Sequence, residues 1–157
     1  MRPYHVDEVL ITPRRLAQRV DEVAREIAAA GPGENLVVIG ILRGSFIFLA
    51  DLVRWFSLND LHPRIDFMIM ESYGSGTTAQ KEPTVTRDCT IDLAGADVVV
   101  VDDILDTGRT LQKAVAHLRA KGAQTVRSCA LLDKPARRIV PFEADFVGFK
   151  IEDAFVV

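Results

Sequence analysis

Three aspartates lie close together near the middle of the chain, between an apolar segment and a turn. The segment Val98–Leu111 reads VVVVDDILDTGRTL and places Asp102, Asp103 and Asp106 after four consecutive valines. Carboxylates spaced in this way can accept hydrogen bonds from neighbouring sugar hydroxyls, or hold a hard divalent cation through their oxygens. We therefore treat this stretch as the first candidate for a binding site.

The residues that follow the aspartates are suited to bind an anion instead of a cation. Thr107, Gly108, Arg109 and Thr110 precede a helical pattern that starts near Thr110. The first turn of a helix offers unpaired backbone N–H groups and the positive end of the helix dipole, and hydroxyls add donors. A phosphate cradle beside an acidic wall suits a sugar phosphate. The alternative interpretation is a polar turn at the end of a strand.

The valine run indicates the element that positions these groups. Four consecutive β-branched residues favour a strand buried on both faces of a parallel sheet. Ligands of open α/β sheets bind at the carboxyl ends of the strands, which places the aspartates at the rim of a pocket.

A second strand, turn and helix occur earlier in the chain. The apolar run 36–41 is followed by Arg43 and Gly44 and then by an apolar helical stretch over 46–56. Arg43 could bind a second anion, and Gly44 permits close approach of the backbone. Alternatively, Gly44 is only a turn residue and Arg43 a solvated charge.

The remaining segments follow the same alternation of helices and strands. Thr12 and Pro13 open a helix, and apolar runs over 65–70 and 125–132 predict two further strands. The region from Ser72 to about Pro83 lacks periodicity and predicts a long loop of the kind that often forms a lid. The pattern predicts an α/β fold with a doubly wound, mainly parallel twisted sheet flanked by helices.

Composition limits the class of protein. The chain has 157 residues, of which 48% are hydrophobic and 26% charged, with a net charge of −3. We expect one domain over 1–157, and the acidic balance argues against nucleic-acid and membrane partners. The start of the sequence lacks a signal-peptide pattern, so we expect a cytoplasmic protein in which Cys89 and Cys129 are free thiols.

The acid and phosphate pattern also carries a family resemblance. Val98–Leu111 resembles the phosphoribosyl diphosphate motif of type I phosphoribosyltransferases, and its part DILDTGRTL is most similar to the hypoxanthine-guanine branch. The resemblance extends from Val9 to Val157. It implies a type I phosphoribosyltransferase fold with a small hood built from the chain ends. The implied activity is purine salvage, in which phosphoribosyl diphosphate and hypoxanthine or guanine give IMP or GMP and pyrophosphate.

The resemblance assigns roles to the acidic residues. It implies that Asp102 and Asp103 hold the ribose hydroxyls, directly or through water and Mg²⁺, and that residues 107–110 anchor the 5′-phosphate. Asp106 contacts the same substrate and is the expected catalytic residue, a general base that takes a proton from the purine. The expected assembly is a homodimer or homotetramer.

Other positions also match the family. Arg43 and Gly44 correspond to a Leu-Lys-Gly segment that binds pyrophosphate and carries a cis peptide before the glycine. The resemblance also implies that Ser72 and Tyr73 begin a lid that closes over phosphoribosyl diphosphate.

The purine site is expected from three residues. Lys134 corresponds to the lysine that meets the six-position oxygen and thereby selects oxo-purines over adenine. Phe155 corresponds to the aromatic residue that stacks on the base, and Val156 meets the purine edge through its backbone.

Two departures from the family pattern stand out. Asp102 replaces a glutamate, and the family pattern continues beyond Val157 with a Gly-Tyr-x-Leu-Asp-Tyr segment that supplies a metal-binding aspartate and a pyrophosphate-binding arginine. Either that tail follows in the full protein, which is our expectation, or the chain is impaired.

Three alternative functions stay open from sequence alone. The first is a non-catalytic regulator that binds phosphoribosyl diphosphate, and the second is a xanthine- or guanine-preferring relative. The third is a phospho-acceptor receiver domain. Receivers place their acidic pair after the first strand, whereas here the pair lies about two-thirds along the chain.

Overall fold

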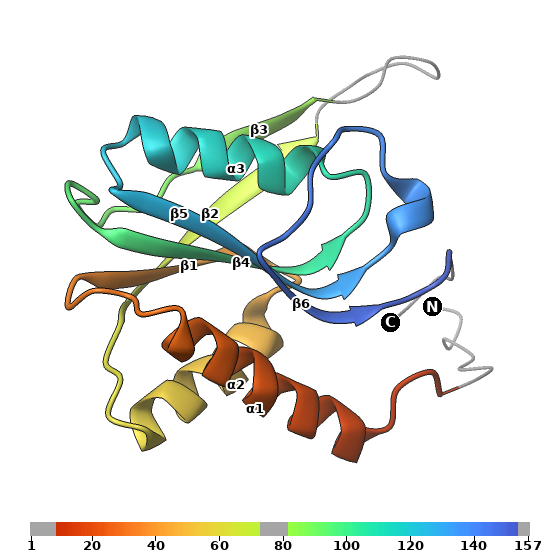
Figure 1. Cartoon of the computed structure of the whole chain (residues 1–157). Coiled ribbons are helices and arrows are strands. Elements are labelled where there is room, and N and C mark those ends of the chain that lie inside the picture. The colour runs from red at the N-terminus through yellow and green to blue at the C-terminus, as the bar shows by residue number, and fades with distance from the viewer. Residues whose placement is uncertain (1–8, 73–81, 154–157) are drawn as a thin grey trace, which may run out of the picture.

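The computed structural model describes residues 9–72 and 82–153 and contains one six-stranded sheet (Figure 1). The strand order is β3-β2-β1-β4-β5-β6, and every neighbouring pair is parallel except β2 and β3. The elements are α1 (Pro13–Ala29), β1 (Leu36–Leu42), α2 (Phe46–Leu58), β2 (Arg64–Ser72), β3 (Pro83–Arg87), β4 (Asp97–Leu105), α3 (Arg109–Ala120), β5 (Thr125–Asp133), the 3₁₀ turn η1 (Pro135–Arg137) and β6 (Phe146–Lys150).

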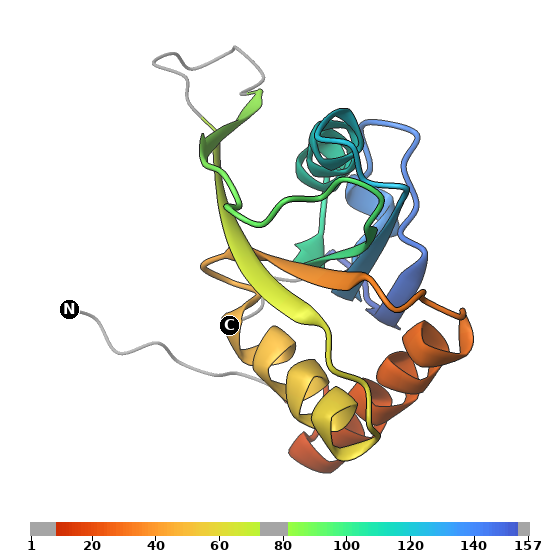
Figure 2. The same ribbon diagram turned by 90° about the vertical axis from the view of Figure 1, so that its left-hand side faces the viewer.

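Helices cover both faces of the sheet, as the sequence pattern predicts. Helices α1 and α2 lie against one face and α3 against the other (Figures 1 and 2). Alternate valines of β4 divide between the two cores, because successive strand residues point to opposite faces. Val99 and Val101 pack with α1 and α2, whereas Val98 and Val100 pack in the core that contains α3.

The first helix begins and ends where local sequence signals place it. Thr12 caps α1 by accepting a hydrogen bond from the Arg15 backbone N–H at 3.3 Å, and Pro13 occupies the first turn. Val20, Val23 and Ile27 are buried, and the chain turns at Gly31 with φ of 65°. The structure therefore confirms the predicted start of this helix.

The central strand is longer than its valine run. Pairing with β5 continues past Val101 through Asp102 opposite Ala130 and on to Leu105 opposite Asp133. The acidic pair therefore lies within the strand, and only Asp106 belongs to the turn. The sequence around the two aspartates does not show that the strand extends to Leu105, because the strand it pairs with, β5, is distant in sequence.

The hairpin of β2 and β3 also reaches further than expected. Ser72 pairs with Pro83 and Glu71 with Thr84. Ser72 is therefore the last residue of β2, and the prediction of a loop starting there was wrong by one residue. The hood expected from the chain ends falls largely on residues 1–8 and 154–157, outside the described residues. No helix within 9–72 or 82–153 is long and apolar enough to cross a bilayer.

Candidate active site

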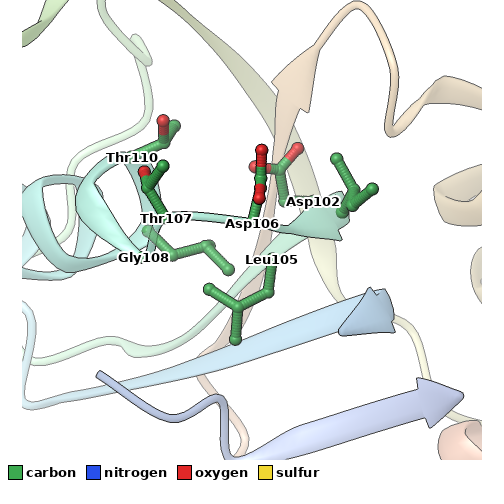
Figure 3. Close-up of a pocket in the computed structure, with 8 residues that line it drawn as sticks. Asp102, Leu105, Asp106, Thr107, Gly108 and Thr110 are labelled. Atoms are coloured by element: carbon green, nitrogen blue, oxygen red, sulfur yellow. The ribbon is translucent and has the colours of Figure 1, made fainter. Parts of the chain in front are cut away.

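A cavity of about 210 Å³ opens at the carboxyl end of β4 and the start of α3. Figure 3 shows the carboxyl groups of Asp102 and Asp106 pointing in the same direction, with Thr107 and Thr110 beside them at the helix start. The lining consists of Asp102, Ile104, Leu105, Asp106, Thr107, Gly108, Thr110 and Leu111. The fold thus brings most of the predicted acidic wall and phosphate cradle together around one cavity, whereas Asp103 and Arg109 are not in its lining.

Helix α3 begins after a glycine, which has no side chain to cap the backbone N–H groups of the first turn. Gly108 is the N-cap with φ of 87°, and no side chain caps the helix. A Cβ at this position would lie 2.9 Å from Arg138 Cδ and 3.0 Å from Val140 Cγ2, so the backbone also approaches its neighbours closely. The Arg109 backbone N–H makes a long hydrogen bond of 3.5 Å to Thr107 Oγ1, and the N-cap itself has no side-chain acceptor, so the start of the helix can bind an anion in the cavity.

The acidic pair has an unfavourable electrostatic environment without a ligand. Asp102 is 8% exposed, and the Asp103 backbone N–H donates to its Oδ1 at 3.0 Å. Burial, and then the neighbouring Asp103 charge, raise the pKa of Asp102 well above its usual value. A cation or a pair of hydroxyl donors placed here would relieve this cost.

The second predicted anion site lies against the acidic pair. A Cβ at Gly44 would collide with the Asp103 carboxylate, so only glycine lets the turn after β1 pass this side chain. The Leu42–Arg43 peptide is cis, before the glycine as the resemblance implies. Buried Ser45 holds the turn by donating from Oγ to the Ile41 carbonyl at 2.6 Å. Strands β1 and β4 are neighbours, and this adjacency joins the two predicted sites.

The predicted purine lysine lies next to the end of β4. Its backbone N–H donates to the Leu105 carbonyl at 2.9 Å, immediately before Asp106. Lys134 is 8% exposed, and its Nζ is 4.0 Å from Asp153 Oδ1. The cation therefore reaches the edge of the sheet that carries the cavity, from the adjoining strand β5.

One predicted phosphate residue is placed differently from the others. The side chain of Arg109 is largely buried and its guanidinium lies 3.9 Å from Glu82 Oε1, just before β3. Arg109 thus begins α3 while its charge faces the β2–β3 hairpin. Ser72 contributes the last backbone position of β2, and Tyr73, Phe155 and Val156 lie outside the described residues.

Sequence reasoning missed two arginines at this site. Arg137 Nε donates to Asp106 Oδ1 at 3.2 Å, and Arg138 donates to the Asp106 carbonyl. In sequence they belong to a basic group after β5 that indicates only a solvated turn or an interface. The only available signal was its position after a strand that ends at the same sheet edge.

Comparisons with known proteins agree with this geometry. A phosphoribosyl transferase domain model matches residues 5–157. A hypoxanthine-guanine phosphoribosyltransferase of Aquifex aeolicus is 41% identical, over 96% of this chain and 83% of the relative. A hypoxanthine phosphoribosyltransferase of Escherichia coli is 39% identical, over 98% of this chain and 85% of the relative. The structure of a hypoxanthine phosphoribosyltransferase from Trypanosoma cruzi in complex with the product IMP superposes with a TM-score of 0.86. It is 32% identical and covers 99% of this chain and 86% of that one.

An open, mainly parallel sheet with acids and a helix start at its carboxyl edge is typical of the class of α/β proteins that bind ligands at this edge, and here the acids and N–H donors suit a sugar phosphate. The matches are more specific than this class. The chain belongs to the phosphoribosyl transferase domain family, among the hypoxanthine phosphoribosyltransferases.

Proposed function

We propose that this chain is a purine salvage enzyme that transfers the phosphoribosyl group of phosphoribosyl diphosphate to hypoxanthine. The products are IMP and pyrophosphate, and guanine is the second substrate, which gives GMP. The observation that carries the proposal is the cavity where the acids of β4 meet the uncapped start of α3. The names of the relatives and the IMP complex of the Trypanosoma cruzi protein support the purine acceptor.

The cavity lining supports a division of the sugar phosphate between two groups of residues. We assign the 5′-phosphate to residues 107–110, whose backbone N–H groups and hydroxyls are its donors. We assign the ribose hydroxyls to Asp102 and Asp103, which accept hydrogen bonds. The side chain of Asp102 is one methylene shorter than the glutamate of the family pattern, so its buried carboxylate would reach the ribose through water or Mg²⁺.

The acidic pair also suits Mg²⁺, which we propose as the cofactor. Magnesium is commonly held by one or two carboxylates and completes its shell with water and substrate oxygens. Asp102 and Asp103 provide two adjacent carboxylates, and the described residues contain no cluster of three or more ligating side chains. When bound, the ion would neutralise charge on the diphosphate.

The leaving pyrophosphate is assigned to the turn after β1. Departure of pyrophosphate develops negative charge on the leaving group, and a fixed donor beside it lowers the barrier. Arg43 supplies a guanidinium with two parallel donors, and Gly44 lets the backbone approach the anion. Contact of this turn with Asp103 supports placing pyrophosphate next to the ribose.

The purine is assigned to the opposite side of Asp106. As a general base, Asp106 would take a proton from the imidazole ring of the purine while the sugar carbon bonds to the purine and loses pyrophosphate. Lys134 would donate a hydrogen bond to the six-position oxygen of the purine. Adenine has an amino group at that position, which could not accept this hydrogen bond. Phe155 and Val156 would complete the purine site, and Ser72 and Tyr73 would begin a lid that excludes water.

The proposal also covers the domain organisation, the assembly and the cellular location of the enzyme. We propose a single domain over 1–157 in a homodimer or homotetramer. Exposed Phe46 and Ile47 at the start of α2, and Phe67 on the adjoining β2, support an interface between copies. A cytoplasmic location is supported by two buried free thiols, Cys89 and Cys129, which suit a reducing compartment.

A spectrophotometric assay with Mg²⁺, phosphoribosyl diphosphate and each purine in turn tests the proposal. We expect turnover of hypoxanthine and guanine but not of adenine, and the Lys134→Gln variant should lose preference for oxo-purines. Preference for xanthine would assign the chain to the xanthine-preferring relatives. Tight binding of phosphoribosyl diphosphate without turnover of any purine would contradict the enzyme and favour the regulator.

A further inference from the structure

The expected general base has a charged partner from another element. The carboxylate of Asp106 accepts a hydrogen bond from Arg137 Nε at 3.2 Å. The same guanidinium lies 3.6 Å from Asp153 Oδ2 through its NH1 atom. Arg137 is the last residue of η1, and half of its side chain is exposed. It therefore joins the turn after β4 to the segment after β6.

The next residue holds the same aspartate by its backbone. Arg138 donates to the carbonyl oxygens of Asp106 and of Leu105, the latter at 3.3 Å. Its guanidinium also pairs with the buried Asp133 at the end of β5. Consecutive arginines thus contact the two ends of one residue, Arg138 the main chain and Arg137 the carboxylate.

The contact with Arg137 engages one of the two carboxylate oxygens. Because Nε occupies Oδ1, the plane of the carboxylate is restricted and the direction of Oδ2 is set. Proton transfer requires the acceptor oxygen to lie within hydrogen-bond reach of the reacting nitrogen, and small misplacements reduce the rate strongly. An ion pair that fixes the rotation of Asp106 would therefore act on the chemical step.

Several other charged groups surround this contact. Asp102 lines the same cavity from β4, and Lys134 and Asp153 extend the ion-pair network beyond Arg137. Lys134 at the N-cap of η1 and Arg137 at its end are thus the cations of this network. Its carboxylates come from the end of β4 and from the segment after β6. Arg137 is the member that touches Asp106 directly.

We propose that Arg137 is a positioning residue for phosphoribosyl transfer, which holds the Asp106 carboxylate in the orientation that accepts the purine proton. This inference rests on the proposed function, in which Asp106 is the general base. Arg137 acts through Asp106 and makes no contact with the reacting atoms. Its partner Asp153 holds the far side of the guanidinium and limits its rotation.

The experiment is a double-mutant cycle on steady-state kinetics, with Arg137→Gln, Asp106→Asn and the combined variant. Both side chains of this ion pair are partly exposed, so we expect about a fivefold lower kcat for Arg137→Gln, with KM for phosphoribosyl diphosphate within about twofold. In the Asp106→Asn background the same change should have almost no further effect, because its target is gone. Arg137→Lys keeps a single donor and should recover part of kcat.

The control is Arg25→Gln, which removes an exposed arginine of α1 whose charge acts on Glu22. It should leave kcat unchanged, and thermal unfolding of every variant checks that the fold is retained. If Arg137→Gln unfolds the protein, Arg137→Lys provides the same comparison in a folded chain.

Two results would overturn the inference while leaving the proposed function intact. One is a kcat of Arg137→Gln within twofold of the parent. The other is an equal loss in both backgrounds, which would mean that Arg137 contacts substrate itself. A kcat of Asp106→Asn within threefold of the parent is a different result, because it refutes the general base and the inference with it.

Discussion

The two ends of helix α3 carry charged and polar groups that are used in opposite ways. At the C-terminal end, Asp88 accepts from Lys121 Nζ at 2.8 Å and lies 3.0 Å from His117 Nε2. At the N-terminal end, Asp106 and the helix start face a cavity, and Gly108 contributes no capping side chain. The charged groups at the C-terminal end pair with each other within the protein, whereas the N-terminal end of the helix faces a cavity that a ligand can enter.

The acids at the two ends differ in the direction of their pKa shifts. Burial would raise the pKa of Asp88, but hydrogen bonds from Lys121 and His117 lower it to about 2. Burial raises the pKa of Asp102, and the neighbouring charge of Asp103 raises it further. A carboxylate that its neighbours neutralise stabilises the fold, whereas a buried carboxylate beside a second, partly buried one is typical of a binding site.

The largest expected effect is on catalysis at the N-terminal end. Asp106→Asn keeps the size of the side chain and removes the base. We expect kcat to fall about 10²- to 10⁴-fold, while substrate affinity changes much less. Steady-state and single-turnover kinetics measure the two quantities separately. Asp21→Asn on the exposed face of α1 is the matched control and should retain full kcat.

The next effect is on stability and comes from the face of α3 that packs on the sheet. Leu118 is fully buried, so Leu118→Ala should lower the free energy of unfolding by about 2–5 kcal/mol. Urea denaturation measures this loss, and kcat of the folded fraction should stay near the parent value. Leu58→Ala, at a side chain that is 85% exposed, is the control. Equal losses for both variants would contradict the assigned core.

A smaller effect is expected from the glycine that begins α3. Gly108→Ala places a Cβ in the left-handed region and against Arg138 and Val140, and the backbone strain alone costs about 1–2 kcal/mol. KM for phosphoribosyl diphosphate should rise, because the cradle must shift. Gly95→Ala has φ of 67° and open space around its Cβ, so it separates strain from displacement. An unchanged KM in Gly108→Ala would refute the cradle.

The smallest effect is expected at the C-terminal end and depends on pH. The folded pKa of Asp88 lies below the unfolded value of 3.8, so its stabilisation is present above pH 4 and disappears as pH falls through about 2. Its side chain is 38% exposed, so solvent screening limits the loss in Asp88→Asn to about 1 kcal/mol near neutral pH. Denaturation of both proteins from pH 6 to pH 2 should show the difference shrink.

The control for this prediction is Asp51→Asn, which removes an exposed ion pair with Arg54 in α2. It should change stability by less than about 0.5 kcal/mol. A loss in Asp88→Asn that is independent of pH would show that the carboxylate charge has no part in joining α3 to the segment after β3.

The sequence by itself determined the elements whose signals are local. Thr12 and Pro13 start α1, the valine run forms the centre of β4, and the turn over 107–110 leads into α3. These features depend on capping, side-chain branching and periodicity over a few residues. The assignment of the acids and the cradle to one edge also followed, because parallel strands share a carboxyl edge.

The tertiary structure alone decided how distant side chains meet. His117 lies in an amphipathic helical segment that by itself suggests only a surface position, and the fold pairs it with Asp88, 29 positions earlier. The contact of Gly44 with Asp103 depends on β1 and β4 being neighbours in the sheet. Arg137 reaches Asp106 because β5 ends beside β4. Sequence periodicity describes one element at a time, whereas these contacts depend on strand order and register between elements, which packing of the whole chain selects.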